Sequence, residues 1–544
     1  MFKKNKTKIL LIAIMLASFV LMFFSAQSDS LTNDEKVHIT AGYLHTWKGD
    51  YTFNTEHPPL LNDLAGLFAK FAKPNLPEKP LSSFNSGSDQ WEFADLFFYN
   101  SQNNVDKIIL FSRLPFIFLT LCLIYLVFLL AKTLFGVKAG LIAATLTAFS
   151  PNILAHGRLA TTDIGLVFFF LLTCWLLRKY FLKPNWQNAL FLGLSLGLVI
   201  LAKFSGVIIL PVIFLGLIYI WKTKKPKFLS AFGQFLIILI LPIILIWVFY
   251  AFSMRANLDN SLLMMPFEKF VAGLKTVMDH NNQGHLTYLN GQLSSTGWWY
   301  YFPLVLWYKM TLSELILLVV SIIVLSLRAK RSNLYQIDCF VADAPRNDKH
   351  IDKFNYYLII FPPLLFLVVS MIGHIDIGIR HVLVLLPFFY IFISQLINYQ
   401  NRYLKFVLLV LLVGQIVICI LAFPNYIAYF NQIAGGSKGG IKHLADSNLD
   451  WDQNIKRFKK YVEENKVEKV YQDFYDGNPL NYYGINYNDV PKKPTNGMVA
   501  ISAQWLVVPR DRFDIDWVKN YPPDDIISNG IYIWRFDKKP VELR

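Results

Sequence analysis

The sequence predicts a polytopic α-helical membrane protein that carries a small α/β domain at its C-terminal end. Hydrophobic residues make up 54% of the 544 positions and charged residues only 16%, whereas an ordinary soluble domain is about 25% charged. Apolar runs long enough to cross a bilayer core, which takes roughly 20 helical residues, recur through most of the chain. They stop near residue 425, where the composition becomes mixed. This composition excludes a disordered, collagenous or coiled-coil chain.

Eleven apolar runs are predicted to span the membrane. The first, residues 9–24, follows the basic stretch MFKKNKTK, and an uncleaved helix is favoured over a signal peptide. The other predicted spans are residues 108–131, 138–155, 163–182, 188–202, 204–221, 228–252, 311–327, 354–373, 379–398 and 403–423. They divide the chain into a first transmembrane helix (1–26), a first outer loop (27–106), a transmembrane core (107–424) and a C-terminal domain (425–544).

Lys and Arg residues determine the predicted orientation of these spans. The formal net charge is +15, and the basic residues crowd the N-terminus and the stretches RKYFLK, WKTKKPK and NYQNRYLK. Cytoplasmic loops carry the excess of Lys and Arg, so the N-terminus is predicted to be cytoplasmic and the segments 27–106, 253–297 and 425–544 extracytoplasmic. We expect a multi-pass protein of a bacterial inner membrane. No basic stripe with interleaved aromatics lies outside the spans, so no nucleic-acid partner is expected.

The parts outside the predicted spans differ in character. In the tail, FKKYVEENK is typical of a helix, and KVYQDFY, GMVAIS and GIYIWRF are typical of strands. Residues 328–353 are unlike their surroundings and are predicted to be a cytoplasmic insertion without function. Neither a disulfide nor a cysteine metal site is expected, because three of the four cysteines lie within apolar runs and Cys339 lies in that insertion.

Ionisable side chains gather at the predicted outer ends of the spans. Charges at the edge of a membrane are costly and therefore mark functional candidates, and scattered solvated charges would not sort to one side. The candidates are Asp34, Glu35, His57, Arg158, Asp163, Lys309, Asp376, Arg380 and His381.

These residue types favour sugar transfer from a lipid phosphate. The chain has no GxGxxG and no GxxxxGK[ST] motif, so nothing in it is built to cradle a nucleotide. A carboxylate can take the proton of an acceptor hydroxyl, and cations can stabilise the charge that develops on a departing phosphate. One base and a cationic clamp are enough for displacement at a sugar C1.

Several motifs in a fixed order carry a family resemblance. They are NDEKVHITAGYLHTWKGD with EHPPL, SPNILAHGRLATTD, GLSLGLVILAKFSGVIILP, YLNGQLSSTGWWYYFP, IGIRHVLVLLP and, in the tail, YFNQIAGGSKGGIKHLADSNLDWDQ. In these the chain resembles the GT-C glycosyltransferases that use polyprenyl-phosphate sugars, especially the protein O-mannosyltransferases of glycosyltransferase family 39 and the lipid A aminoarabinose transferases. The resemblance implies a GT-C architecture and an inverting transfer. It leaves open the sugar (mannose, another hexose or aminoarabinose) and the acceptor (protein, lipid or glycan).

The resemblance also implies roles for the candidate residues. Asp34 matches the catalytic base and Glu35 its motif partner. The residues implied to bind the donor phosphate or substrate are His57, Arg158, Asp163, Lys309, Arg380 and His381. Some relatives need a divalent cation, so Mg²⁺ or Mn²⁺ held by Asp34, Asp163 or Asp376 is an open expectation.

Four departures and some alternative interpretations qualify the resemblance. The family proline after Lys309 is missing, Asp376 replaces an asparagine, Val384 replaces a proline, and Asp452 replaces a glycine. Asp34 and Glu35 are equally suited to cap a helix, and Arg158 is long enough to snorkel to lipid headgroups. For the whole chain, the alternatives are a transporter, which would hold ionisable groups near the midplane, and an inactive family member.

Overall fold

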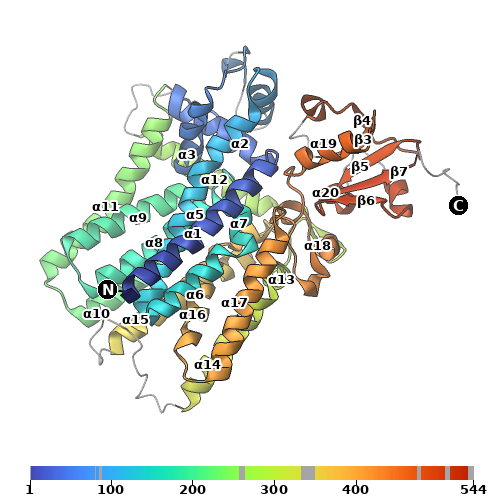
Figure 1. The fold of residues 1–544 in the computed structure, drawn as a ribbon. Coiled ribbons are helices and arrows are strands. Elements are labelled where there is room, and N and C mark those ends of the chain that lie inside the picture. The colour runs from blue at the N-terminus through green and yellow to red at the C-terminus, as the bar shows by residue number, and fades with distance from the viewer. Residues whose placement is uncertain are drawn as a thin grey trace.

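The structure, a computed structural model, describes residues 2–79, 81–84, 89–256, 264–331, 349–474, 479–508 and 515–536. Most of the predicted insertion, including Cys339, lies outside the described residues. A bundle of long helices makes up the larger part of the molecule, and a five-stranded domain lies beside one end of it (Figure 1).

Within the described residues, seven helical segments are long and apolar enough to cross a membrane, or up to nine if each of two bent pairs is one span. The seven contain α1 (Phe2–Ser28), α5 (Val105–Phe135), α8 (Asp163–Leu182), α10 (Leu210–Lys224), α11 (Phe228–Ser253), α15 (Lys349–Ile372) and α17 (Arg402–Ala422). The bent pairs are α6 (Val137–Ala148) with α7 (Pro151–Gly157) at 63°, and α13 (Tyr301–Lys309) with α14 (Leu312–Arg331) at 116°. The predicted polytopic helical fold is thereby confirmed.

Two of the eleven predicted spans form shorter helices than expected. Residues 188–202 lie in α9 (Trp186–Ala202), which has 17 residues. The run 379–398 is broken into a 3-10 turn (Ile379–Val382), α16 (Leu385–Ser394) and a second 3-10 turn. Each is shorter than the roughly 20 residues that a straight span needs. Because α16 begins only at Leu385, residues 379–382 lie outside this helix and form part of the candidate site.

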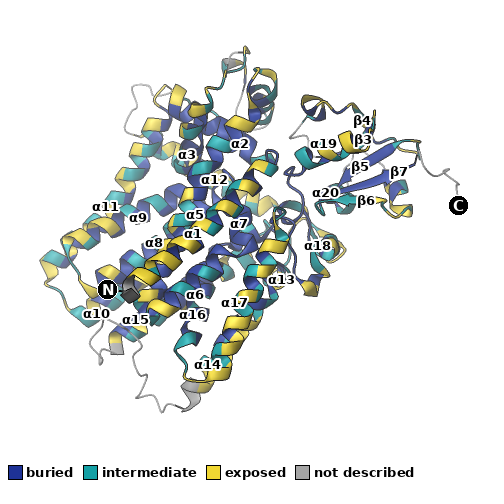
Figure 2. Ribbon diagram, viewed as in Figure 1, coloured by how far each residue is buried: buried dark blue, intermediate teal, exposed yellow. Residues whose placement is uncertain are grey.

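Burial separates central from peripheral helices. The helices α5 and α8 are mostly buried, whereas the outward faces of α1, α11 and α17 expose large apolar side chains (Figure 2). Leu229 on α11 and Leu421 on α17 are 81% and 78% exposed. A surface helix that is apolar on its exposed side needs an apolar solvent. This distribution fits a bundle surrounded by lipid.

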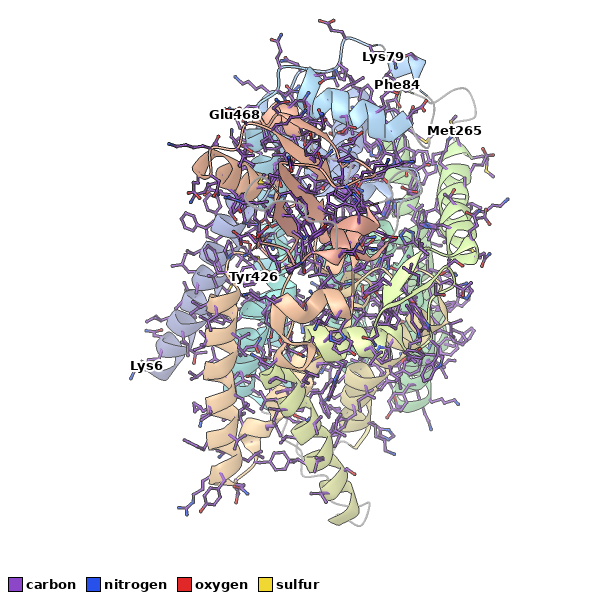
Figure 3. The ribbon with its side chains drawn as sticks, turned by 90° about the vertical axis from the view of Figure 1, so that its right-hand side faces the viewer. Lys6, Lys79, Phe84, Met265, Tyr426 and Glu468 are labelled. Atoms are coloured by element: carbon purple, nitrogen blue, oxygen red, sulfur yellow. The ribbon has the colours of Figure 1, made fainter. Side chains whose placement is uncertain are left out.

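The three segments predicted to lie outside the membrane gather at the same end of the bundle. Lys79 and Phe84 of the first loop, Met265 of α12 (Met265–Gln283) and Glu468 of the C-terminal domain lie together at the top of Figure 3, well away from Lys6 near the N-terminus. The segments therefore share one side, as the charge pattern requires.

Two helices of the first loop are in backbone contact. α2 (Asn33–Tyr43) packs against α3 (Pro59–Ala69), where Pro59 starts the helix at its first position. A Cβ on Gly42 would lie 1.7 Å from the Asn62 carbonyl oxygen, and one on Gly66 would lie 1.9 Å from the Gly42 carbonyl carbon. Only glycine permits this approach, which holds α2 at a fixed position over the bundle. Short elements complete this end; they are the π-helical turns Leu44–Lys48 and Leu96–Asn100, α4 (Asp89–Asp95), β1 (Thr287–Leu289) and β2 (Gln292–Ser294).

The sharp bend between α13 and α14 forms without the proline that the family pattern has there. Met310 is extended, and α14 begins with a reciprocal cap: Thr311 N–H donates to Glu314 Oε2 at 2.8 Å, and Glu314 N–H donates to Thr311 Oγ1 at 3.1 Å. The missing proline therefore does not abolish the bend.

The C-terminal domain has a mixed sheet in the order β4-β3-β5-β7-β6. Strand β3 pairs in parallel with β4 and β5, and β7 pairs antiparallel with β5 and β6. The elements are α19 (Ile455–Glu464), β3 (Val470–Asp473), β4 (Tyr487–Asp489), β5 (Met498–Ser502), α20 (Ala503–Val507), β6 (Asp525–Ile527) and β7 (Ile531–Arg535). The predicted helix and three strands are present, whereas β4 and β6, of three residues each, had no recognisable pattern.

Candidate active site

The predicted residues Asp34 and Arg380 form an ion pair. Asp34 is the second residue of α2, and Arg380 lies in the 3-10 turn Ile379–Val382. Arg380 Nη1 donates to Asp34 Oδ2 at 2.7 Å, the length of a charge-assisted hydrogen bond. The Asp34 side chain remains 27% exposed, whereas that of Arg380 is 9% exposed. A carboxylate that solutes can reach is thus paired with a largely enclosed cation.

Arg380 is also held by an aromatic ring. Its Cζ lies 4.2 Å from the ring centroid of Trp451, which lies four residues before the start of α19. The geometry is that of a cation–π contact. Arg380 Nε is buried and has no hydrogen-bond partner. Because a guanidinium is a flat fork of five N–H donors, it can hold Asp34 with one nitrogen and offer another to an oxyanion.

His381, the next residue, contributes a second unpartnered group. Its Nε2 is buried without a hydrogen-bond partner. The ring lies beside Phe302 of α13, with centroids 6.5 Å apart. An unsatisfied buried polar atom is costly, so a pair of them on adjacent residues indicates a position that a polar ligand would fill.

The first loop places two histidines side by side. The rings of His57 and His38 meet edge to face with centroids 4.7 Å apart. Asn54 Oδ1 accepts a hydrogen bond from His57 Nδ1 at 2.9 Å. Burial lowers the pKa of both rings, and that of His57 falls well below its ordinary value, with His38 and Lys203 adding to the effect. Both histidines are therefore neutral near pH 7.

Glu56 precedes His57 and is a second carboxyl group near Asp34. Burial and the charge of Asp34 raise the pKa of Glu56. Because like charges disfavour a second ionised carboxylate, these surroundings favour the protonated form of Glu56.

Asp163 and Lys203 form the second ion pair of the site. Lys203 Nζ lies 2.7 Å from Asp163 Oδ1, with side-chain exposures of 17% and 1%. Thr161 Oγ1 also donates to Asp163, at 3.2 Å. Asp163 is the first residue of α8, where a carboxylate favours the helix N-terminus. The ammonium of Lys203 has three donors and is the more exposed member of the pair.

Glu35 is sealed inside the protein. Its side chain and that of Arg113 on α5 are both 0% exposed, and Arg113 Nε and Nη2 donate to the two Glu35 oxygens at 2.8 and 2.6 Å. Ala160 N–H and Thr32 N–H donate to the same carboxylate. Burial alone would raise the pKa of Glu35, but Arg113 outweighs it and lowers the pKa. Glu35 is thus an ionised structural group that caps α2, as the capping alternative expected, and it has no path to substrate in this geometry.

Arg158 is also fully buried, contrary to the expected contact with a phosphate. Its Nε and Nη2 donate to Asp29 Oδ2, and its Nη1 donates to the carbonyls of Leu154 and Ala155. Arg457 of α19 donates to the other Asp29 oxygen. Asp29 therefore joins the end of α1 to the bundle and to the C-terminal domain. Every donor nitrogen of Arg158 is engaged, so none is left for a ligand.

Lys309 lies at the bend after α13 and is 1% exposed. Its Nζ donates to the carbonyls of Ile427 and Asn448 at 2.7 and 2.9 Å, and lies 4.4 Å from the Phe430 ring centroid. Instead of facing a phosphate, this ammonium fixes the first part of the predicted C-terminal domain.

The three carboxylates named as possible ligands of a divalent cation have separate partners. Asp34 pairs with Arg380, Asp163 pairs with Lys203, and Asp376 Oδ2 accepts from Trp298 N–H at 2.8 Å. No group of three or more His, Cys, Asp or Glu within the described residues is arranged to hold a metal ion. These positions do not fit a common cation site, and we derive no step through one.

The residues that sequence reasoning missed are Asp29, His38, Arg113, Lys203 and Trp451. Arg113 lies inside a predicted span, where an ionisable residue is a candidate by default, and Lys203 alone separates two predicted spans. Those two signals were present in the sequence. Trp451 lies in the tail motif that carries the family resemblance, but its contact with Arg380 joins parts of the chain 71 positions apart that only the fold brings together.

Residues 104–250 match the family model of the dolichyl-phosphate-mannose-protein mannosyltransferases. The match confirms the resemblance found in the sequence over the stretch from α5 to α11. Arg113, Arg158, Asp163 and Lys203 lie within it, whereas Asp34 and Arg380 lie outside. No curated protein sequence matches the chain.

Among solved structures, the chain is similar to ArnT from Cupriavidus metallidurans bound to undecaprenyl phosphate, at 12% identity and a TM-score of 0.45, over 96% of this chain and 97% of that chain. Oligosaccharyltransferase AglB from Archaeoglobus fulgidus, in complex with an inhibitory peptide and a dolichol-phosphate, matches at 13% identity and 0.41, over 91% and 61%. The S. cerevisiae protein O-mannosyltransferase Pmt1–Pmt2 complex bound to the sugar donor matches at 19% and 0.37, over 47% of this chain and 37% of that chain. This chain therefore spans little more than a third of the yeast chain.

Proposed function

We propose that this protein is a membrane glycosyltransferase of the GT-C type, which moves a sugar from a polyprenyl phosphate to an acceptor hydroxyl. The observation that carries the proposal is the accessible Asp34 carboxylate paired with Arg380, whose Nε, like Nε2 of the adjacent His381, has no partner. A base and a set of oxyanion donors thus lie next to each other at one end of a lipid-facing bundle. The family match supports the same class of reaction.

Asp34 is the catalytic base of the proposed reaction. It removes the proton of the acceptor hydroxyl while the acceptor oxygen forms a bond to the sugar C1. The bond between C1 and the phosphate oxygen breaks, and the phosphate leaves with the electron pair, still attached to its lipid. Attack opposite the leaving group inverts the anomeric carbon. Glu35 takes no part in proton transfer and acts as a positioning residue, because its salt bridge to Arg113 fixes the start of α2.

Arg380, His381 and Lys203 hold the donor phosphate. Arg380 Nε and His381 Nε2 are the buried unpartnered nitrogens, and Lys203 is the more exposed member of its ion pair. Together they can stabilise charge that builds up on the leaving phosphate, an effect worth several kcal/mol per well-placed donor, roughly 2.7–4 in measured cases. Arg158 and Lys309 support the surrounding structure, and Asp163 orients Lys203.

The proposed site opens on the extracytoplasmic side, where the charge pattern places the first loop, α12 and the C-terminal domain. The sugar is mannose, another hexose or aminoarabinose, and the acceptor is a protein, a lipid or a glycan. His57, neutral and partly exposed, is placed to line the acceptor side of the site.

A panel of radiolabelled polyprenyl-phosphate sugars tests the proposal. Membranes that contain the wild type, Asp34→Asn or the control Asp279→Asn, a change on the exposed face of α12, are incubated with each donor. Label should pass to a protein, lipid or glycan fraction with the wild type and the control, and transfer should fall by about 10²–10⁴-fold with Asp34→Asn, the range for loss of a general base. Equal transfer by Asp34→Asn, in protein of normal melting temperature, would refute the role of Asp34. No transfer by well-folded wild type from any donor would refute the function.

A further inference from the structure

The segment that leads into α19 runs directly beside the Asp34–Arg380 pair. We name residues 446–455 the strap. It begins with the 3-10 turn Asp446–Asn448 and ends at the first residue of α19. Nearly all of it is buried. A segment that only connected two domains would lie on the surface, so its burial calls for a structural explanation.

The strap holds the N-terminal end of α2 through main-chain hydrogen bonds. Asn33 N–H donates to the Trp451 carbonyl, and Ser30 N–H donates to the Gln453 carbonyl, each at 3.1 Å. Ser30 Oγ accepts from Ile455 N–H at 3.0 Å. The first of these bonds is one residue away from Asp34. The position of the proposed base therefore depends on the strap.

The strap holds the turn before Arg380 as well. Ser447 Oγ donates to the Ile377 carbonyl at 2.7 Å, and Asn448 Oδ1 accepts from Ile379 N–H at 3.2 Å. A Cβ on Gly378, whose φ is +148°, would lie 2.7 Å from Ser447 Oγ. Ser447 and Asn448 thus form hydrogen bonds with the backbone on both sides of Gly378, immediately before Arg380.

Trp451 completes this arrangement with its side chain. Trp451 is 2% exposed, and the Cζ of the Arg380 guanidinium lies over its ring, 4.2 Å from the centroid. One nitrogen of that guanidinium holds Asp34 while Nε is free. An aromatic face on one side restricts the guanidinium plane, and the plane determines which way its free donor points.

We propose that Trp451 is a positioning residue for donor binding: its ring orients Arg380 so that Nε meets the lipid-linked phosphate while Nη1 stays on Asp34. The inference rests on the proposed function. It also gives the C-terminal domain a role in the reaction, because the ring is delivered by the segment that this domain anchors through Arg457 and Asp29.

The test measures binding of decaprenyl phosphate and transfer by the full-length protein in detergent. Trp451→Leu removes the aromatic face and keeps an apolar side chain, whereas Trp451→Phe keeps a smaller ring. We expect Trp451→Leu to weaken decaprenyl phosphate binding and raise the donor KM by roughly tenfold, the equivalent of a cation–π contact in an enclosed site. The kcat should change by less than about threefold, and Trp451→Phe should recover most of the affinity.

A double-mutant cycle separates this role from simple stabilisation. If Trp451 acts through Arg380, Trp451→Leu should add little to the affinity loss of Arg380→Ala, whereas independent effects would add. The control is Trp534→Leu, which removes a tryptophan that is also 2% exposed from strand β7, where its indole N–H donates to the Tyr521 carbonyl. It should leave the donor KM unchanged in the folded fraction.

The outcomes distinguish the two proposals. A wild type that neither binds decaprenyl phosphate nor transfers sugar refutes the proposed function, and the role of Trp451 toward the donor falls with it. An active wild type in which Trp451→Leu matches the control, or in which the losses of Trp451→Leu and Arg380→Ala add fully, refutes the positioning role alone. A raised donor KM that Trp451→Phe restores, with a non-additive cycle, supports it.

Discussion

Arg380 donates to the Asp34 carboxylate at 2.7 Å although the two residues lie 346 positions apart in the chain. The pair joins the first loop to the turn that follows α15. One hydrogen bond thus joins the proposed catalytic base to the side chain that is proposed to bind the donor phosphate. A donor phosphate that engages Arg380 would draw on the same guanidinium that holds Asp34. Donor binding and the position of the Asp34 side chain are therefore expected to be linked.

Replacing Arg380 by lysine should impair donor use more than catalysis. An ammonium is a compact point charge that cannot bridge Asp34 and a phosphate as a planar guanidinium can. We expect Arg380→Lys to raise the donor KM by about tenfold, measured by initial rates across donor concentrations. Arg402→Lys, at an exposed position at the start of α17, is the matched control. An unchanged donor KM in Arg380→Lys would argue against phosphate contact.

Arg158→Met should reduce stability without changing the donor KM. The substitution removes one of the two arginines that hold Asp29 and leaves a buried carboxylate poorly compensated, which typically costs about 3–5 kcal/mol. Melting temperature in detergent should fall clearly, while the donor KM of the folded fraction should stay within about twofold. The opposite result, normal stability with a tenfold higher KM, would restore the phosphate role expected from the sequence.

Glu35 and Arg113 should behave as one unit. Glu35→Gln or Arg113→Met alone leaves a buried charge without its partner, at a cost of about 3–5 kcal/mol, whereas the double variant removes both charges and should cost less than the sum of the two. Thermal unfolding of the three variants measures this. Fully additive losses would show that the two side chains do not depend on each other.

The stability of the folded protein should depend on acid pH through two buried carboxylates, Glu35 and Asp29. The pKa values of Glu35 and Asp29 are lowered in the folded protein, because arginine charges outweigh burial. Their stabilisation is therefore present above the ordinary values of 4.5 and 3.8 and is lost as the pH falls through the lower folded values. Wild type should keep its melting temperature down to about pH 5 and lose stability below pH 4. Glu35→Gln should show a weaker loss over that range.

Asp376→Asn should stabilise the protein at neutral and alkaline pH. Burial raises the pKa of Asp376 from 3.8 to about 7, so its contribution is fully present below pH 3.8 and is lost as the pH rises through 7. Asparagine keeps an oxygen to accept the Trp298 N–H and cannot ionise. At pH 8 the variant should gain at least about 1 kcal/mol, whereas at low pH it should gain less. Melting curves at pH 5 and pH 8 would contradict this if the gain were equal at both.

The candidate residues differ in how well the sequence indicated the surroundings of their side chains. Same-side clustering and motif order picked out Asp34, Arg380 and His381, which the structure brings to one place, since Arg380 contacts Asp34 and precedes His381. The same reasoning assigned Arg158 and Lys309 to a phosphate, but both are enclosed by protein acceptors. A motif shows that a cation is needed at a position and does not show which anion it meets. Burial decides that, and burial is a property of packing.

The sequence by itself determined the membrane character, the eleven apolar segments, the common side of the polar loops and the α/β nature of the tail. These follow from local quantities: the length of apolar runs, the placement of Lys and Arg, and the period of apolar residues. Only the tertiary structure decided which charges are sealed into pairs, such as Glu35 with Arg113, and which stay within reach of a ligand. It alone brought Trp451 to Arg380. Such contacts join segments far apart in the chain, and their existence depends on how helices and loops pack together rather than on any local pattern.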